Sequence, residues 1–369
     1  MSVVRFVHAD ALRLGSPING LSDSPDWLRK TAASAVRTAV TNTIEVAIAG
    51  RCQFVLIAGR LCESTQDLDL SVGWLRSQVA GLKDHGIQLV IAGHPTSEFP
   101  SLAGLDAILV APGQRLDVRP SQLDRPELTV SSAQAAARPG SLGIEVSLTA
   151  HARPLADLAY TAVPAVTPST HNSADGTTTA HDRLLRLSAG SPQAIQPTER
   201  GTFGCQLVEA DFDRNTLTAR FCPTDLIRYS QVLLNCLPGT SIERVCDLLR
   251  DRSRTIAAAG RCTTVVEWVI DGDIVWPAAR REPFNEVDLL RELRGSLNAG
   301  HSGAWPGRIR FSDTCLVDVP GDSPAAAREL AAVQSDRWQR SASDSLRSNK
   351  SPRIGSDILT SLSLLRRVA

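Results

Sequence analysis

The sequence has no excess of charge of either sign, and it contains very little lysine. Its 369 residues include 39 basic and 39 acidic side chains, so the formal net charge is zero. A strongly basic domain is the usual electrostatic signature of nucleic-acid binding, and the chain as a whole lacks it. Lysine occurs only at Lys30, Lys83 and Lys350, so nearly every basic residue is an arginine. The composition excludes a globally basic protein and leaves room for a local basic surface.

Closely spaced cysteines and long apolar runs are also missing, and we expect no leader segment. The eight cysteines form no CxxC pair and no cluster with histidine, which excludes the usual zinc-binding spacings. No stretch approaches the roughly 18 apolar residues that a membrane span requires. The apolar start Val3–Val7 is short and is followed at once by His8, unlike a signal peptide. We therefore expect a cytoplasmic protein with reduced thiols and no membrane contact.

Strand-like and helix-like segments alternate along the first two thirds of the chain, which predicts the α/β class. Short runs rich in Val, Ile and Leu predict strands at residues 3–8, 53–58, 87–92 and 107–111. Helical spacing of apolar residues predicts helices at 26–47, capped by Asp26, and at 67–84. Residues 207–211 and 216–221 predict a hairpin. Polar composition predicts surface loops at 112–141 and 167–182.

A change of pattern after Pro223 predicts a second, smaller domain. A single core seldom grows far beyond about 250 residues, so a chain of this length favours two domains. Strands at 226–235, 265–271 and 309–317 alternate with helices at 241–259 and 285–297, as in an α+β unit. We expect domains at 1–222 and 223–320, followed by a Ser- and Arg-rich tail at 321–369. The tail ends in an amphipathic segment with Leu359, Leu362 and Leu365 on one face.

Four apolar runs end where a loop begins, and these loops share an order and spacing with a known family. The loops contain Asp10-Ala11-Leu12-Arg13-Leu14-Gly15, Ala58-Gly59-Arg60-Leu61-Cys62-Glu63, Ala92-Gly93-His94-Pro95 and Ala162-Val163-Pro164-Ala165. Ser191-Pro192-Gln193, Glu199 and Gly204-Cys205 continue the order. Together they resemble the calcineurin-like metallophosphoesterases, and within them the SbcD-type DNA repair exonucleases. The resemblance implies a β-sandwich flanked by helices, with the smaller α+β domain as a capping domain.

Most of the family's metal-binding side chains are missing from these loops. The former metal-site positions hold Ala11, Arg13, Arg60, Glu63, His94, Pro95, Val163 and Ala165. A two-metal site requires carboxylate, imidazole and amide donors. Alanine and valine side chains offer no donor, and an arginine side chain stays protonated and has no lone pair to give. We therefore expect no bound metal cofactor.

A shift of register offers two weak candidates for metal ligands, Asp10 and His94. Each is one residue away from a ligand position of the resembled family. A one-residue slip at a strand end turns the side chain to the opposite face of the sheet, although a bulge could re-aim Asp10. Leu12 would then occupy the place of the family's next histidine. A slip therefore restores part of one ligand set at most.

Two classes of function remain open. The first is a catalytically inactive SbcD-like homologue that acts as a partner-binding or nucleic-acid-binding subunit. The alternative is an active metal-dependent phosphoesterase or DNA exonuclease with rearranged ligands, which would use manganese or another divalent metal. The resemblance implies an SbcC-like coiled-coil ATPase as a partner, and we expect the terminal amphipathic segment to be the contact.

The two arginines at former ligand positions predict a different use of the cleft. Parallel strands end on the same side of a sheet, so we expect Arg13 and Arg60 to lie near each other. Guanidinium groups suit phosphate oxygens, which predicts an anion-binding pocket for DNA or another phosphate-bearing ligand. The alternative is that Glu63 and Asp10 neutralise both arginines and leave an inert, salt-bridged cluster.

Overall fold

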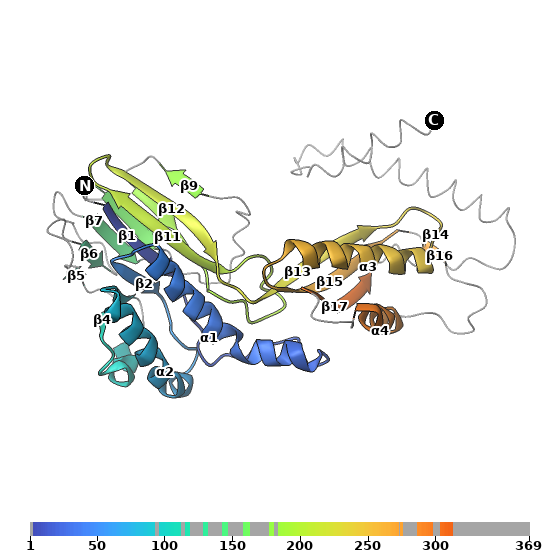
Figure 1. Cartoon of the computed structure of the whole chain (residues 1–369), viewed down its shortest axis with the longest axis horizontal. Helices are drawn as coiled ribbons and strands as arrows, with labels where there is room; N and C mark the ends of the chain where they lie inside the picture. The colour runs from blue at the N-terminus through green and yellow to red at the C-terminus, as the bar shows by residue number, and fades with distance from the viewer. Residues whose placement is uncertain are drawn as a thin grey trace, which may run out of the picture. The chain divides into compact units, whose positions relative to one another are not determined.

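The computed structural model of the chain describes residues 3–92, 96–111, 115–118, 128–131, 142–146, 158–162, 177–180, 184–272, 274–275, 286–297 and 303–312. Within these residues the fold is α/β, which confirms the predicted class (Figure 1). The chain divides into two compact units. Unit 1 comprises residues 1–234, 246–269 and 285–310, and unit 2 comprises residues 235–245, 270–284 and 311–369.

The largest sheet has seven strands in the order β4-β3-β2-β1-β11-β12-β9. These strands are β1 (Val3–Ala9), β2 (Phe54–Ala58), β3 (Gln88–Ala92), β4 (Ala107–Val110), β9 (Thr177–Ala180), β11 (Gly204–Asp211) and β12 (Thr216–Pro223). The first four in this order pair in parallel, and β11, β12 and β9 are antiparallel to their neighbours. All five residues of β2 are buried, as expected for a central parallel strand that is covered on both faces.

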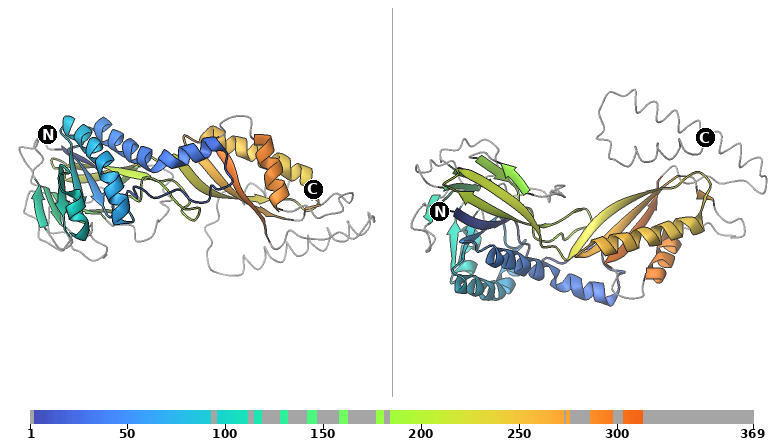
Figure 2. Two further views of the ribbon diagram at one scale, coloured as in Figure 1. Left: turned by 90° about the horizontal axis from the view of Figure 1, so that it is seen from below. Right: turned by 45° about the horizontal axis from the view of Figure 1, so that its top comes forward.

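Helices α1 (Asp26–Ala49) and α2 (Thr65–Asp84) cover one face of this sheet (Figure 2). Their buried residues and the strand residues beneath them form one core cluster, which includes Val36, Val40, Leu68, Leu75, Val7, Val55 and Ile91. Ser64 caps α2 by accepting a hydrogen bond from the backbone N–H of Asp67 at 3.1 Å. The predicted capping role of Asp26 is wrong, because Pro25 is the N-cap residue of α1 and Asp26 lies in the first turn. In the first turn, the negative carboxylate of Asp26 still interacts favourably with the positive end of the helix dipole.

A second sheet packs against the other face. Its strands follow the order β10-β8-β7-β6-β5 and are β5 (Arg115–Val118), β6 (Leu128–Ser131), β7 (Leu142–Val146), β8 (Leu158–Ala162) and β10 (Leu184–Leu187). A core cluster joins the two sheets and includes Phe6, Phe54, Val208, Tyr160 and Leu185. The rings of Phe6 and Phe54 stack 4.7 Å apart, and Tyr160 meets Phe6 edge-on at 5.1 Å. Aromatic pairs at such distances add about 0.5–1.5 kcal/mol to the effect of burial.

The remaining strands form a three-stranded sheet, β13-β15-β17, and a two-stranded pair, β14-β16. Their bounds are β13 (Ile227–Asn235), β14 (Thr240–Ser241), β15 (Thr263–Asp271), β16 (Ile274–Val275) and β17 (Ala304–Phe311). Helices α3 (Ile242–Ala259) and α4 (Glu286–Leu297) lie beside the three-stranded sheet (Figure 2). Leu28 of α1 shares a core cluster with Tyr229 and Trp305 of this sheet.

Three loop and strand predictions differ from the structure. Segments 112–141 and 167–182 were expected to be loops throughout, but they contain β5, β6 and β9. These are short strands of four residues each, and their polar composition hides the strand pattern that sheet pairing stabilises. The last predicted strand begins at Ala304 instead of residue 309. Residues 313–317 and the tail at 321–369 lie outside the described residues.

Candidate functional site

The loops that follow β1 and β2 lie side by side at the carboxyl end of the seven-stranded sheet. The backbone N–H of Leu12 donates to the carbonyl of Arg60 at 3.0 Å, and that of Leu14 donates to Leu61 at 2.8 Å. Gly59 begins the second loop at φ 149°, a backbone conformation that residues with a side chain rarely adopt. Parallel strands thus bring Ala11, Arg13, Arg60 and Glu63 to one edge of the sheet, the usual place for a site in such sheets.

Arg13 has one short and one long contact with a carboxylate. Its Nη1 donates to Oε1 of Glu199 at 2.6 Å, and its Nε lies 3.6 Å from Oε1 of Glu63, which is too long for a hydrogen bond. The side chains of Arg13 and Glu199 are 13% and 2% exposed, whereas that of Glu63 is 54% exposed. The second oxygen of Glu199 accepts the backbone N–H of Ile195 at 2.8 Å. The Arg13–Glu199 pair is therefore a nearly enclosed ion pair, and Glu63 is a peripheral charge.

Arg60 pairs with a different carboxylate. Its Nη2 donates to Oε1 of Glu98 at 3.0 Å, and the Glu98 side chain is 7% exposed. The Arg60 side chain is 47% exposed, so water screens one side of this pair. Glu98 belongs to η1 (Thr96–Leu102), a 3-10 helix after β3. The guanidiniums of Arg13 and Arg60 thus have separate internal partners, although the backbones of their loops are hydrogen-bonded to each other.

Asp10 contacts His8, Ser188 and Gly190 and belongs to a buried polar cluster. His8 is fully buried, and its Nδ1 lies 2.7 Å from the Tyr160 hydroxyl. Its Nε2 lies 3.0 Å from Oδ1 of Asp10, at an angle outside hydrogen-bond geometry. Burial, with a smaller effect of the Asp10 charge, raises the pKa of Tyr160 well above its usual value. Tyr160 therefore stays protonated, and its hydroxyl can donate to His8.

The remaining oxygen of Asp10 holds the loop before β11. Oδ2 accepts hydrogen bonds from the backbone N–H of Gly190 at 2.8 Å and from the Ser188 hydroxyl at 3.0 Å. The Ser191 hydroxyl donates to the carbonyl of Ala11 at 2.8 Å. The segment that resembles the family's downstream motif therefore packs on the loop after β1, and the Asp10 carboxylate has a structural role in this contact.

The side chains present do not fit a pair of divalent cations. Ala11 offers no donor, Arg13 and Arg60 bring fixed positive charge, and Asp10 is engaged by His8 and the backbone. No cluster of three or more His, Cys, Asp or Glu side chains suited to a metal occurs within the part of the chain that the structure describes. The predicted positions His94, Pro95, Val163 and Ala165 lie outside the described residues. We derive no catalytic step through a metal at this site.

Sequence reasoning did not assign the acidic partners of the two arginines. It considered Glu63 and Asp10, but Glu199 and Glu98 make the short contacts. Glu199 lies in the downstream segment that carries the family resemblance, but the sequence did not indicate that this segment contacts the loop after β1. Nothing in the sequence around Glu98 marks it, because η1 is short and contains Pro100.

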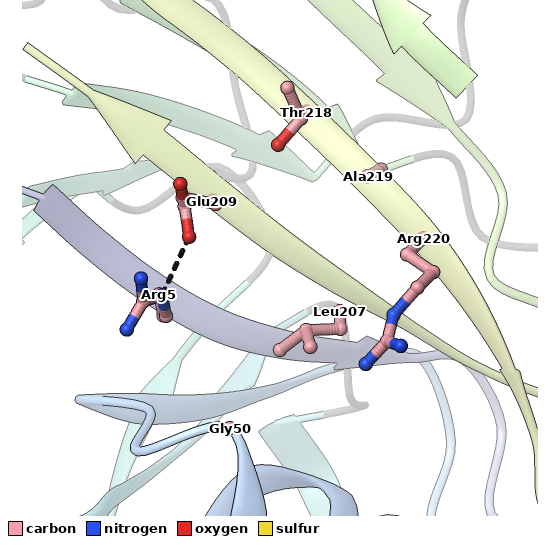
Figure 3. A pocket seen from close by; sticks show the side chains of 7 residues that line it. All are labelled: Arg5, Gly50, Leu207, Glu209, Thr218, Ala219 and Arg220. Atoms are coloured by element: carbon pink, nitrogen blue, oxygen red, sulfur yellow. Dashed lines mark hydrogen bonds and ion pairs between the residues drawn. The ribbon is translucent and has the colours of Figure 1, made fainter. Parts of the chain in front are cut away.

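A separate cavity lies on the α1 side of β11 and β12. It has a volume of about 360 Å³ and is lined by Arg5, Gly50, Leu207, Glu209, Thr218, Ala219 and Arg220. Figure 3 shows Arg5 paired with Glu209 across neighbouring strands, while the Arg220 side chain extends from β12 and ends beside Leu207. The Nε of Arg5 lies 2.6 Å from Oε2 of Glu209. Within the described residues no carboxylate pairs with Arg220. This cavity was not foreseen from the sequence, because its lining comes from three strands and a helix end.

Two further observations bear on the class of protein. In the described part of the chain, no helix combines the length and the apolar character of a membrane span. No family model matches the chain, and no curated protein matches it either.

Proposed function

We propose that the chain is a catalytically inactive homologue of the SbcD-type metallophosphoesterases and acts as a binding subunit. The observation that carries the proposal is the Arg13–Glu199 pair at the end of β1. A protonated guanidinium stands where the resembled family has a metal-binding histidine, and an internal carboxylate at 2.6 Å neutralises it. A cation entering this site would meet fixed positive charge and would have to displace a nearly buried ion pair.

The architecture is a second support for the proposal. Two sheets pack face to face, and α1 and α2 cover the outer face of the larger one. This arrangement agrees with the β-sandwich flanked by helices that the resemblance implies. Many functions share one fold, so the site and not the architecture carries the functional argument.

Metal content and nuclease activity test the absence of catalysis. The purified chain is incubated with manganese, desalted and analysed for bound metal, and hydrolysis of DNA and of a model phosphodiester is measured. We expect substoichiometric metal and no turnover, because positions 11, 13 and 60 lack donors. Two metals per chain would contradict the proposal. So would turnover that disappears in Asp10→Ala or His94→Ala, because contaminating nuclease would be unaffected by either change.

DNA affinity at several salt concentrations tests the binding role at the same edge of the sheet. Arg60 is the more accessible of the two arginines, and a phosphate could share its guanidinium with Glu98. If the edge contacts a nucleic-acid backbone, Arg60→Ala should flatten the salt slope by roughly one unit for each lost phosphate contact. Arg51→Ala, an exposed arginine before β2 at the opposite end of that strand, is the matched control. Equal slopes for all three proteins would assign binding to another surface.

The coiled-coil ATPase partner remains part of the proposal, and the predicted contact lies outside the described residues. Co-purification of an SbcC-like partner with the full chain is compared with a chain cut at Pro352, which removes Leu359, Leu362 and Leu365. We expect recovery to fall sharply without these apolar anchors. Equal recovery from both chains would exclude the terminal segment as the contact.

A further inference from the structure

Cys205 and Cys222 occupy directly opposite positions on the antiparallel strands β11 and β12. Opposite residues in an antiparallel pair have Cα atoms about 4.5–5.5 Å apart, within the roughly 4.4–6.8 Å range of disulfides. The Cys205 thiol reaches the opposite residue, since its Sγ donates to the backbone carbonyl of Cys222 at 3.8 Å. Both thiols are free in the structure. The backbone therefore already has the spacing that a disulfide between them requires.

The surroundings of the two thiols differ in a way that suits a reactive and a resolving cysteine. Cys205 is fully buried and Cys222 is partly exposed. The hydrogen bond with Cys205, aided by the charge of Arg220 and the backbone N–H of Leu207, lowers the pKa of Cys222 to about 7 against the opposing effect of burial. Arg220 and Leu207 also line the 360 Å³ cavity. A small oxidant in that cavity would lie beside Arg220 and Leu207, the two residues that help to lower the pKa of Cys222.

A third thiol, Cys52, is an electrostatic neighbour of both Cys205 and Cys222. It is buried, and burial raises its pKa to about 12, so it stays protonated at neutral pH. It lies on the segment between α1 and β2 and is not paired in register with either strand. Cys52 is therefore the natural competitor in any test of which thiols react.

We propose that Cys222 and Cys205 form a peroxide-sensitive thiol pair that closes into a cross-strand disulfide. The Cys222 thiolate attacks one oxygen of hydrogen peroxide, the O–O bond breaks, and the leaving oxygen takes a proton to become water. This leaves Cys222 as a sulfenic acid. The Cys205 sulfur then attacks the sulfenic sulfur, the S–O bond breaks, and hydroxide leaves as water with the Cys205 proton. Two thiols lose two electrons and two protons in total, and the peroxide is reduced to two waters.

Peptide mapping of the oxidised full chain tests this proposal without any substitution. The reduced protein is treated with limiting hydrogen peroxide, blocked with an alkylating agent and digested with trypsin without reductant. Cleavage after Arg200, Arg214, Arg220 and Arg228 places Cys205 on residues 201–214 and Cys222 on residues 221–228. We expect these two peptides to be joined, two free thiols to be lost, and dithiothreitol to restore both.

Three serine variants separate the roles. In Cys205→Ser we expect the disulfide to disappear and a dimedone adduct to accumulate on Cys222. In Cys222→Ser we expect neither product, and Cys52→Ser should behave as the parent does. Cys236, which is also partly exposed, is the internal control for non-specific oxidation. Joining of Cys222 to the Cys52 peptide, residues 52–60, would overturn the proposal, as would oxidation of Cys222 no faster than that of Cys236.

Discussion

The carboxyl ends of β1 and β2 and the α1 side of β11 and β12 both present arginines on a sheet, and they use them differently. At the strand ends, Arg13 and Arg60 each have a carboxylate within 3.0 Å. On the α1 side of β11 and β12, Arg220 has no carboxylate partner among the described residues and acts on the Cys222 thiol. A paired guanidinium must release its internal partner before it can bind a ligand, whereas an unpaired one is available. Among the described residues, the arginines at the strand ends are thus the more fully neutralised.

The largest expected effect concerns the enclosed ion pair. Glu199→Ala leaves the Arg13 guanidinium nearly buried without its short contact, and it also removes the acceptor of the Ile195 N–H. Breaking a buried pair in this way lowers the free energy of unfolding by about 3–5 kcal/mol. Urea denaturation followed by circular dichroism measures this loss.

Glu63→Ala is the control for the same arginine. The Glu63 side chain is 54% exposed and 3.6 Å from Arg13, so its removal should cost no more than about 1 kcal/mol. Equal losses in the two variants would mean that Arg13 is not held mainly by Glu199, and that the strand ends are as open as the α1 side of β11 and β12.

The buried polar cluster should give the next largest effect. Tyr160→Phe removes the hydroxyl that lies 2.7 Å from His8 Nδ1 and leaves a fully buried nitrogen without a partner. Such a loss costs about 1–3 kcal/mol, measurable by the same denaturation experiment. Tyr229→Phe is the control, because the carbonyl of Asn19 that its hydroxyl contacts belongs to an exposed residue that water can reach. A larger loss in Tyr229→Phe would argue against the His8–Tyr160 hydrogen bond as an important contact of the buried cluster.

The pH dependence of Cys222 alkylation is a sharper test of the thiol region. The pKa of Cys222 is lowered by Cys205 of β11, by Arg220 of β12 and by the backbone N–H of Leu207, and is raised by burial. With a pKa of about 7, the thiolate fraction and hence the iodoacetamide rate should rise roughly tenfold between pH 6 and pH 8. Arg220→Ala removes a positive charge that favours the thiolate, so the midpoint should move to higher pH. An unchanged midpoint would mean that Arg220 does not lower the pKa of Cys222.

The smallest effect is expected for the ion pair in the cavity wall. Arg5 and Glu209 are 42% and 39% exposed, so water screens their 2.6 Å contact. Arg5→Ala should change the free energy of unfolding by about 1 kcal/mol or less in a denaturation experiment. A loss as large as that of Glu199→Ala would mean that the two regions do not differ in the way described.

Periodicity in the sequence was enough to predict the central elements. The strands β1 to β4 and the helices α1 and α2 lie where the apolar spacing places them, since burial repeats with the period of each element. The hairpin of β11 and β12 was also predicted, and its register brings Cys205 opposite Cys222. The pairing of these two thiols was therefore implicit in the position of the turn. The short polar strands β5, β6 and β9 were missed, because neighbouring strands and not their own composition stabilise them.

By itself the sequence determined the α/β class, the strands that meet at the carboxyl edge, and the presence of Arg13 and Arg60 in the loops at that edge. Only the tertiary structure decided how those charges are used. Arg13 finds its partner 186 residues away and His8 finds Tyr160 152 residues away. Local sequence patterns report which face of an element is buried. A guanidinium in a poorly solvated site needs an opposite charge close to it. Whether that charge is a bound anion or an internal carboxylate depends on which distant side chain the fold places beside the guanidinium.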